Sequence, residues 1–233
     1  MNPRPDNPNI LQLMTAAAKL EPLLDQIAFV GGCVTGLLVT DPAAAPVRAT
    51  LDVDVIVQAA TYAEFTILEQ KLRQLGFHES REEGAPICRW VNGDLLLDFM
   101  PIDPSILGFG NRWYGPALTM AQTISLGTHE LRVITAPYFI ATKLEAFRGR
   151  GRNDFKVHDL EDIVTVMDGR AEIVEEARSA EPALRQYLNT EFKSLLSNRE
   201  FQDALPGHLL PDTASQQRLG LVLERMREMI LDR

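Results

Sequence analysis

The chain has 233 residues, of which 45% are hydrophobic and 24% charged, a balance typical of a globular protein with one large or two modest cores. Its net charge of −9 excludes a whole-protein basic footprint for non-specific nucleic-acid binding, and leaves only a local basic segment, Arg148 to Arg152 with Lys156. The sequence has no bilayer-length apolar run and no secretory signal pattern, and its two cysteines, Cys33 and Cys88, indicate no disulfide framework. We therefore expect a cytoplasmic protein without a membrane partner.

The first part of the chain indicates a strand, a glycine turn and a second strand. An apolar run that ends at Gly31-Gly32 is typical of a buried core strand, and helical spacing precedes it. Two prolines mark the ends of a connector, and alternating valines follow it. The elements expected here are a helix at 10–24, a strand at 26–30, a short helix at 33–39, a connector at 41–46 and a strand at 51–57.

The next part predicts the remainder of a sheet. Asn92-Gly93 between two apolar runs is a strong signal for a hairpin turn, and Gly76 is placed to end the helix before them. We expect a helix at 61–75, strands at 77–80, 87–91 and 95–100, a loop at 101–116, and strands at 123–126 and 131–134. Strand, helix and strand followed by a hairpin predict an α/β (α+β) fold, in which helices flank a mixed β-sheet.

The composition changes after Thr135, and all later apolar spacing is helical. The expected helices are at 137–148, 158–168, 170–178, 181–196 and 214–231. We therefore predict two domains, an α/β core at 1–135 and a helical domain at 136–233.

The strongest chemical signal is a pair of aspartates after the glycine turn. Asp52 and Asp54 project from one face of the predicted strand, since strand side chains alternate with period two. Asp98, the only charge in another apolar run, joins them if the two strands are neighbours. Three carboxylates repel one another unless a cation such as Mg²⁺ neutralises them. Strand-end aspartates that face water are the alternative. Beside Gly31-Gly32, such a cluster suits phosphoryl or nucleotidyl transfer.

Two features of the helical half have a structural and a functional interpretation. Lys143 lies at the edge of an apolar helix stripe, where lysines usually extend to solvent; beside a carboxylate cluster it becomes a candidate phosphate ligand. Asp159 and Asp162 stand at a helix start, where a cap and a favourable dipole interaction are sufficient reasons for them. The residues themselves favour the structural interpretation for both features.

Together these segments resemble the nucleotidyltransferase superfamily with the polymerase-beta-like core, and more specifically the nucleotidyltransferase-type toxins of abortive-infection and toxin–antitoxin systems and their uncharacterised relatives. The shared pattern is a glycine pair, an Arg-x-Thr-x-Asp-x-Asp run, a lysine helix followed by an arginine, and an Asp-x-x-Asp helix start. The matching residues are Gly31, Gly32, Arg48, Thr50, Asp52, Asp54, Lys143, Arg148 or Arg150, Asp159 and Asp162. The resemblance covers residues 26 to 168, with a longer connector before Asp52 than the family usually has.

The resemblance implies a Mg²⁺-dependent enzyme with a nucleotidyltransferase core and a C-terminal helical domain. It would transfer a nucleoside monophosphate from an NTP such as ATP to a hydroxyl, and release pyrophosphate. Two Mg²⁺ ions are implied, with Asp52, Asp54 and Asp98 as the metal ligands and Asp98 also as a base. The resemblance assigns nucleotide binding to Gly31, Gly32, Arg48, Thr50 and Lys143, and catalysis to Asp52, Asp54, Asp98, Lys143 and Asp159, which orients the lysine or helps to position the acceptor.

Several alternatives remain open at this point. The acceptor could be an RNA end such as that of a tRNA, a protein hydroxyl or a small molecule, and a toxin would have an antitoxin protein as partner. A second hypothesis is a non-catalytic module that binds nucleotide or a partner on the same fold. A third is an unrelated α/β protein with structural aspartates. The intact Asp-x-Asp favours an enzyme, because a site that is no longer used tends to lose its mutually repelling charges.

Overall fold

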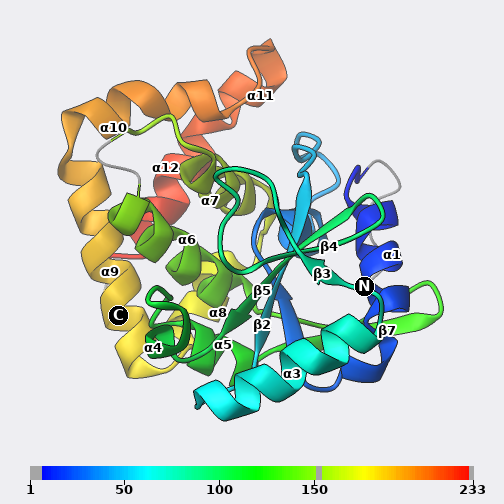
Figure 1. The fold of residues 1–233 in the computed structure, drawn as a ribbon. Helices are drawn as coiled ribbons and strands as arrows, with labels where there is room; N and C mark the ends of the chain where they lie inside the picture. The colour runs from blue at the N-terminus through cyan, green and yellow to red at the C-terminus, as the bar shows by residue number, and fades with distance from the viewer. Residues whose placement is uncertain (1–6, 151–153, 231–233) are drawn as a thin grey trace. The chain divides into compact units, whose positions relative to one another are not determined.

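The structure is a computed structural model that describes residues 7–150 and 154–230 (Figure 1). The described residues form two compact units. Unit 1 takes its residues from Met1–Gly36 and Arg48–Thr135, and unit 2 from Leu37–Val47 and Ala136–Arg233. Residues 37–47, expected within the first domain, thus belong to the helical unit. None of the helices in these described ranges is long and apolar enough to cross a membrane.

Unit 1 is built on a mixed sheet with seven strands among the described residues, in the order β3-β4-β5-β2-β1-β7-β6. The strands are β1 (Ile27–Val30), β2 (Asp52–Val57), β3 (His78–Glu79), β4 (Arg89–Asn92), β5 (Leu95–Pro101), β6 (Gln122–Leu126) and β7 (His129–Val133). Strand β2 is parallel to β5 and antiparallel to β1, and β1 is parallel to β7. The mixed sheet with flanking helices confirms the predicted fold class.

The helical elements of unit 1 pack around this sheet. They are α1 (Ile10–Lys19), η1 (Glu21–Leu23), η2 (Gly32–Val34), α3 (Tyr62–Gln74), α4 (Pro104–Leu107) and α5 (Tyr114–Thr119), and α2 (Thr35–Leu38) leads into unit 2. Helix α3 begins where the Thr61 hydroxyl accepts a hydrogen bond from the Glu64 N–H. It packs on β5 through Phe65, whose ring centroid lies 5.9 Å from that of Phe99. Helix α3 therefore contacts the face of the sheet that carries Phe99 (Figure 1).

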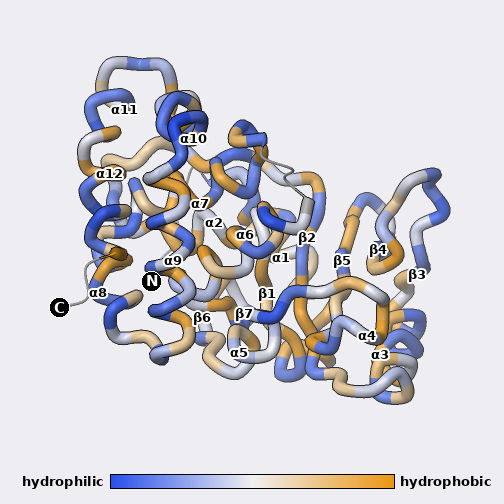
Figure 2. The backbone as a smooth tube through the Cα atoms, turned by 90° about the vertical axis from the view of Figure 1, so that its left-hand side faces the viewer, coloured by the Kyte–Doolittle hydropathy of each residue, from blue (hydrophilic) through white to orange (hydrophobic). Residues whose placement is uncertain are grey.

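The two faces of β2 and β5 differ in chemistry. The register pairs Val53 with Leu97 and Val55 with Phe99, and all four side chains are completely buried. Figure 2 shows β1 and β5 as mainly hydrophobic segments. Because side chains alternate along a strand, the aspartates of β2 and β5 lie together on the opposite face. The sheet thus has an apolar face against α3 and an acidic patch on its other face.

Unit 2 is a bundle of helices together with the connector at 37–47. Its helices are α6 (Ala136–Arg150), α7 (His158–Gly169), α8 (Ile173–Arg178), α9 (Pro182–Ser197), α10 (Arg199–Ala204), η3 (Leu205–His208), α11 (Thr213–Gln217) and α12 (Leu219–Glu228). The Gly169 carbonyl at the end of α7 accepts hydrogen bonds from the N–H groups of Thr40 and Asp41, both at 2.8 Å. This contact fixes the connector on the helical unit.

Three expectations for helices and loops were wrong in detail. The helix expected at 10–24 ends at Lys19, and Pro22, which has no N–H to donate, lies in the 3-10 turn that follows. The loop expected at 101–116 contains α4 and the start of α5; Asp103 caps α4 by accepting from the Ser105 N–H at 2.8 Å. The helix expected at 214–231 is two helices that meet at Arg218.

The hairpin turn of β4 and β5 is also displaced by one residue from its expected place. Asn92 pairs with Leu95, so the turn residues are Gly93 and Asp94 rather than Asn92 and Gly93. Gly93 has a φ of 62°, which glycine adopts without strain. The shift matters because it changes which residue of β4 lies opposite Asp98.

Candidate active site

Three of the predicted site residues meet on the acidic patch of unit 1. Asp54 of β2 lies directly opposite Asp98 of β5 in the parallel register, and Asp52 is two residues earlier on the same face. Asp98 is buried, and Asp52 and Asp54 are half-buried. The condition set for Asp98, that its strand neighbours the strand of Asp52 and Asp54, is therefore met, and the three carboxylates lie at adjacent positions on the sheet.

The glycine turn lies directly against these carboxylates. Gly31 has a φ of 71°, and a Cβ added to it would lie 1.8 Å from Oδ2 of Asp54. Any side chain at this position would therefore both strain the backbone and collide with the carboxylate. Gly32 begins η2 and is buried. The structure brings Gly31 and Asp54 together, as the resemblance implies for a phosphate and metal site.

Arg89 of β4 is a member of the site that the sequence analysis did not find. It lies directly opposite Asp98. Its Nε donates to Oδ1 of Asp98 at 2.8 Å and its Nη2 to Oδ2 at 2.9 Å, and Nη2 also donates to Asp52. The hydrogen bonds to Asp98 raise the pKa of Arg89 well above its usual range, although burial opposes this shift. We call Arg89, Asp52 and Asp98 the sheet cluster.

The sheet cluster bears directly on the predicted metal site. In the described part of the chain, no three His, Cys, Asp or Glu side chains are gathered so that they can hold a metal ion. Arg89 takes up both oxygens of Asp98 and one of Asp52. The donor set nevertheless suits Mg²⁺, because it consists of carboxylate oxygens on adjacent strands of one sheet face. The chemistry of these donors therefore fits Mg²⁺, while Arg89 occupies three of their oxygens in this structure.

The chain enters β2 through a segment fixed by a buried asparagine. Asn9, at the start of α1, donates from Nδ2 to the Arg48 carbonyl at 3.1 Å and accepts at Oδ1 from the Thr50 N–H at 3.0 Å. The Thr50 hydroxyl donates to the Asp52 carbonyl at 3.2 Å. The hydrogen bonds of Asn9 thus fix the backbone at Arg48 and Thr50, just before the carboxylates of β2. Asn9 was not predicted, because its partners lie about forty residues away.

Unit 2 holds the other predicted catalytic residues in a buried ion cluster. Lys143 of α6 places Nζ 3.1 Å from Oδ1 of Asp159 and 2.7 Å from Oδ2 of Asp162, both on α7. All three residues are buried, so Lys143 does not extend to solvent, the interpretation that its helix alone favoured and that the resemblance replaced with a role at phosphate. Val157 is the N-cap of α7, so Asp159 does not have the capping role that its position alone favoured and that the resemblance replaced with a role beside Lys143. We call Lys143, Asp159 and Asp162 the helix cluster.

The basic segment near 148–156 is only partly described. Arg148 donates from Nε to Glu191 of α9 and its side chain is half exposed. Lys156 is exposed, while residues 151–153 and the Arg150 side chain lie outside the described part of the structure. The expected local basic patch therefore stays a prediction.

Comparisons with known proteins bear on the fold. No family model matches the sequence, and no curated protein matches it. A crystal structure of an antigenic nucleotidyltransferase-like protein from Paracoccidioides brasiliensis matches with a TM-score of 0.51 and 19% identity, over 85% of this chain and 92% of that chain. The antibiotic-resistance factor ANT(2'')-Ia matches with a TM-score of 0.47 and 16% identity over 81% and 95%, and JHP933 from Helicobacter pylori with 0.49 and 12% over 95% and 91%.

The match to the Paracoccidioides structure supports the class of fold. At such identities a structural match shows the fold alone, and of these three structures the Paracoccidioides protein has a TM-score above 0.5 and the other two do not. The chain therefore has a nucleotidyltransferase-like fold, with a mixed sheet and flanking helices. Its activity has to be argued from the residues of the site.

Proposed function

We propose that the protein is a Mg²⁺-dependent nucleotidyltransferase that moves a nucleoside monophosphate from an NTP to a hydroxyl acceptor. The observation that carries the proposal is the acidic patch, where Asp54 and Asp98 are register partners and Gly31 lies against Asp54. Three clustered carboxylates destabilise a sheet face by mutual repulsion, so their presence beside a turn at which Gly31 leaves no room for a side chain favours a chemical role.

Each residue has a role in this proposal. Asp52, Asp54 and Asp98 would hold the metal, which when bound would activate the acceptor hydroxyl and stabilise the departing pyrophosphate. The acceptor oxygen forms a bond to the α-phosphorus as the bond to the β-phosphate oxygen breaks. Once Asp98 has lost its hydrogen bonds with Arg89, its carboxylate accepts the proton of the acceptor hydroxyl. The backbone N–H groups of Gly31 and Gly32 approach the triphosphate.

In this proposal the helix cluster would bind a phosphate group of the NTP. Lys143 would contact a phosphate oxygen, and Asp159 would orient the ammonium or help to position the acceptor. Because Lys143 is already paired with Asp159 and Asp162, the phosphate has to compete with two carboxylates. Arg48 and Thr50, held by Asn9 just before the carboxylates, are proposed to contact the nucleotide.

The test is nucleotide binding and pyrophosphate release with Mg²⁺ and each labelled NTP in turn. We expect both for the wild type, with ATP among the substrates, and loss of turnover in Asp54→Asn. Asp94→Asn is the matched control, because Asp94 is an exposed aspartate in the β4–β5 turn. Binding without pyrophosphate release would favour the alternative of a non-catalytic nucleotide-binding module. Equal binding by Asp54→Asn and the control would contradict the proposed site.

A finer proposal is that the enzyme is a cytoplasmic toxin that an antitoxin protein neutralises. It rests on the order of the motifs in the sequence, from the glycine pair to the aspartate helix. Its acceptor would be an RNA end such as a tRNA, a protein or a small molecule, and labelled NTP incubated with each class distinguishes them. Induced expression in bacteria should arrest growth for the wild type and not for Asp54→Asn. Normal growth with an active wild-type enzyme would refute the toxin role alone.

A further inference from the structure

Arg89 contacts the carboxylate oxygens of the sheet cluster that a bound divalent cation would also contact. It is the register partner of Asp98, and one of its nitrogens, Nη2, donates to both Asp98 and Asp52. The guanidinium is charged at every ordinary pH, so it neutralises part of the acidic patch permanently. A divalent cation and Arg89 therefore need the same carboxylate oxygens.

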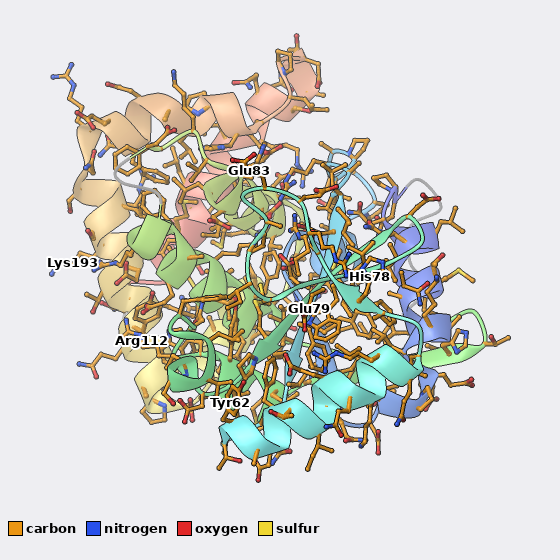
Figure 3. All side chains as sticks on the ribbon, viewed as in Figure 1. Tyr62, His78, Glu79, Glu83, Arg112 and Lys193 are labelled. Carbon is orange, nitrogen blue, oxygen red and sulfur yellow. The ribbon has the colours of Figure 1, made fainter. Side chains whose placement is uncertain are left out.

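The backbone of Arg89 is fixed while its side chain has access to water. Its N–H donates to the Pro86 carbonyl at 2.9 Å, and its carbonyl accepts from the Ser80 N–H at 2.9 Å. The side chain is 19% exposed. Arg89 begins β4 directly after the loop between β3 and β4, in which Figure 3 labels the exposed Glu83. The long side chain can consequently leave the carboxylates without any change in the sheet.

We propose that Arg89 is a displaceable internal cation that competes with the divalent metal for Asp52 and Asp98. This inference rests on the proposed function of the acidic patch. Without metal, Arg89 holds the two carboxylates in place and reduces their repulsion. With metal, the carboxylate oxygens of Asp52 and Asp98 coordinate the ion instead of accepting hydrogen bonds from Arg89, and the Arg89 side chain turns toward solvent. The residue thus sets the metal concentration at which the site becomes competent.

The competition multiplies the intrinsic metal affinity by the fraction of time in which Arg89 leaves the carboxylates free, so a small fraction means weak apparent binding. The contact of Arg89 with Asp98 and Asp52 is charge-assisted, so it is strong enough to weaken metal binding measurably. It is also partly exposed to water, so a divalent ion can displace it. We expect removal of Arg89 to tighten metal binding about tenfold, which corresponds to about 1.4 kcal/mol.

The test is a titration of the nucleotide-free protein with Mg²⁺ and Mn²⁺ by calorimetry, with melting temperature as a second readout. Arg89→Met keeps the length of the side chain and removes its charge. We expect it to bind metal about tenfold more tightly than the wild type, to melt lower without metal, and to gain more from added metal. Arg81→Met is the matched control, since Arg81 is exposed in the preceding loop and its loss changes net charge equally.

Arg89→Lys is a second variant that keeps a positive charge and loses the planar fork, and its affinity should fall between the other two. If Arg89→Met does not fold, tighter metal binding by Arg89→Lys than by the wild type supports the proposal. Metal affinity equal to that of Arg81→Met, weaker affinity, or no metal binding in any variant would overturn it. The titration needs no nucleotide, so it is independent of the test of activity. If the wild type turns over NTP but Arg89→Met has unchanged metal affinity, this inference alone is refuted. If Arg89→Met binds metal more tightly but the wild type has no turnover, only the proposed enzymatic activity is refuted.

Discussion

The sheet cluster of unit 1 and the helix cluster of unit 2 each pair a cation with two aspartates, and the two clusters differ in how far water reaches them. In the sheet cluster the side chains are between 11% and 30% exposed, whereas in the helix cluster they are between 2% and 10% exposed. The sheet cluster uses an arginine whose fork matches a carboxylate, and the helix cluster uses a lysine between two helices.

This difference in exposure separates an exchangeable cluster from a fixed one. Charges that are buried depend strongly on their partners, because no water replaces a partner that is removed. Partly exposed charges lose less, because water and salt screen them. We therefore expect the helix cluster to contribute more to folding stability, and the sheet cluster to respond more to metal. Four predictions test this contrast, from the largest effect to the smallest.

Lys143→Met should have the largest effect on stability. It leaves Asp159 and Asp162 facing each other in a buried site without the ammonium, and breaking a buried ion pair costs about 3–5 kcal/mol. The free energy of unfolding from urea denaturation measures the loss. The control is Lys193→Met on α9, an exposed lysine labelled in Figure 3, which should change stability little. Equal losses for the two variants would mean that the helix cluster is not a structural unit.

The two aspartates of the helix cluster should differ from each other. Asp162 has the shorter contact with Lys143, 2.7 Å against 3.1 Å, and the more buried side chain. Asp162→Asn should lower the free energy of unfolding by about 2–3 kcal/mol and Asp159→Asn by about 1 kcal/mol. If nucleotide binding is measured in parallel, Asp159→Asn should weaken it in a folded protein. A reversed order of stabilities would contradict the burial argument.

Arg89→Met should cost less than Lys143→Met. Without metal, we expect a loss of about 1 kcal/mol in the free energy of unfolding, because the sheet cluster is partly exposed. A double-mutant cycle with Asp98→Asn isolates the pairwise energy of the two side chains. A loss as large as that of Lys143→Met would make Arg89 a fixed structural residue and remove the contrast between the clusters.

The sequence predicted the acidic patch well because strand alternation is a local rule. The positions of Asp52 and Asp54 on one face follow from period two, and Asp98 follows once β5 pairs with β2. Arg89 was missed because of register. A turn at Asn92-Gly93 places Ile87 opposite Asp98, while the observed turn at Gly93-Asp94 places Arg89 there. Testing both turn registers against the aspartate would have found the arginine.

Other features depend on contacts between distant parts of the chain. The helix of Lys143 alone favoured a position at the surface, because it gives no sign of the two aspartates on α7 that pair with this lysine. The prolines of the connector at 41–46 predicted a loop but not its partner. Asp41 accepts a hydrogen bond from Arg218 at 2.6 Å, across 177 residues. Local spacing carries no information about such partners, so the membership of residues 37–47 in unit 2 could not be predicted.

Salt should produce the smallest effect, and it should act on one cluster only. Raising ionic strength from about 0.01 M to about 1 M shortens the Debye length from about 30 Å to about 3 Å. The coupling energy of Arg89 with Asp98 should then fall by a few tenths of a kcal/mol, since water and ions reach this pair. The coupling of Lys143 with Asp162 should stay constant, because little solvent reaches those side chains. Double-mutant cycles at both salt concentrations measure the two values, and equal salt dependence would show that exposure does not separate the clusters.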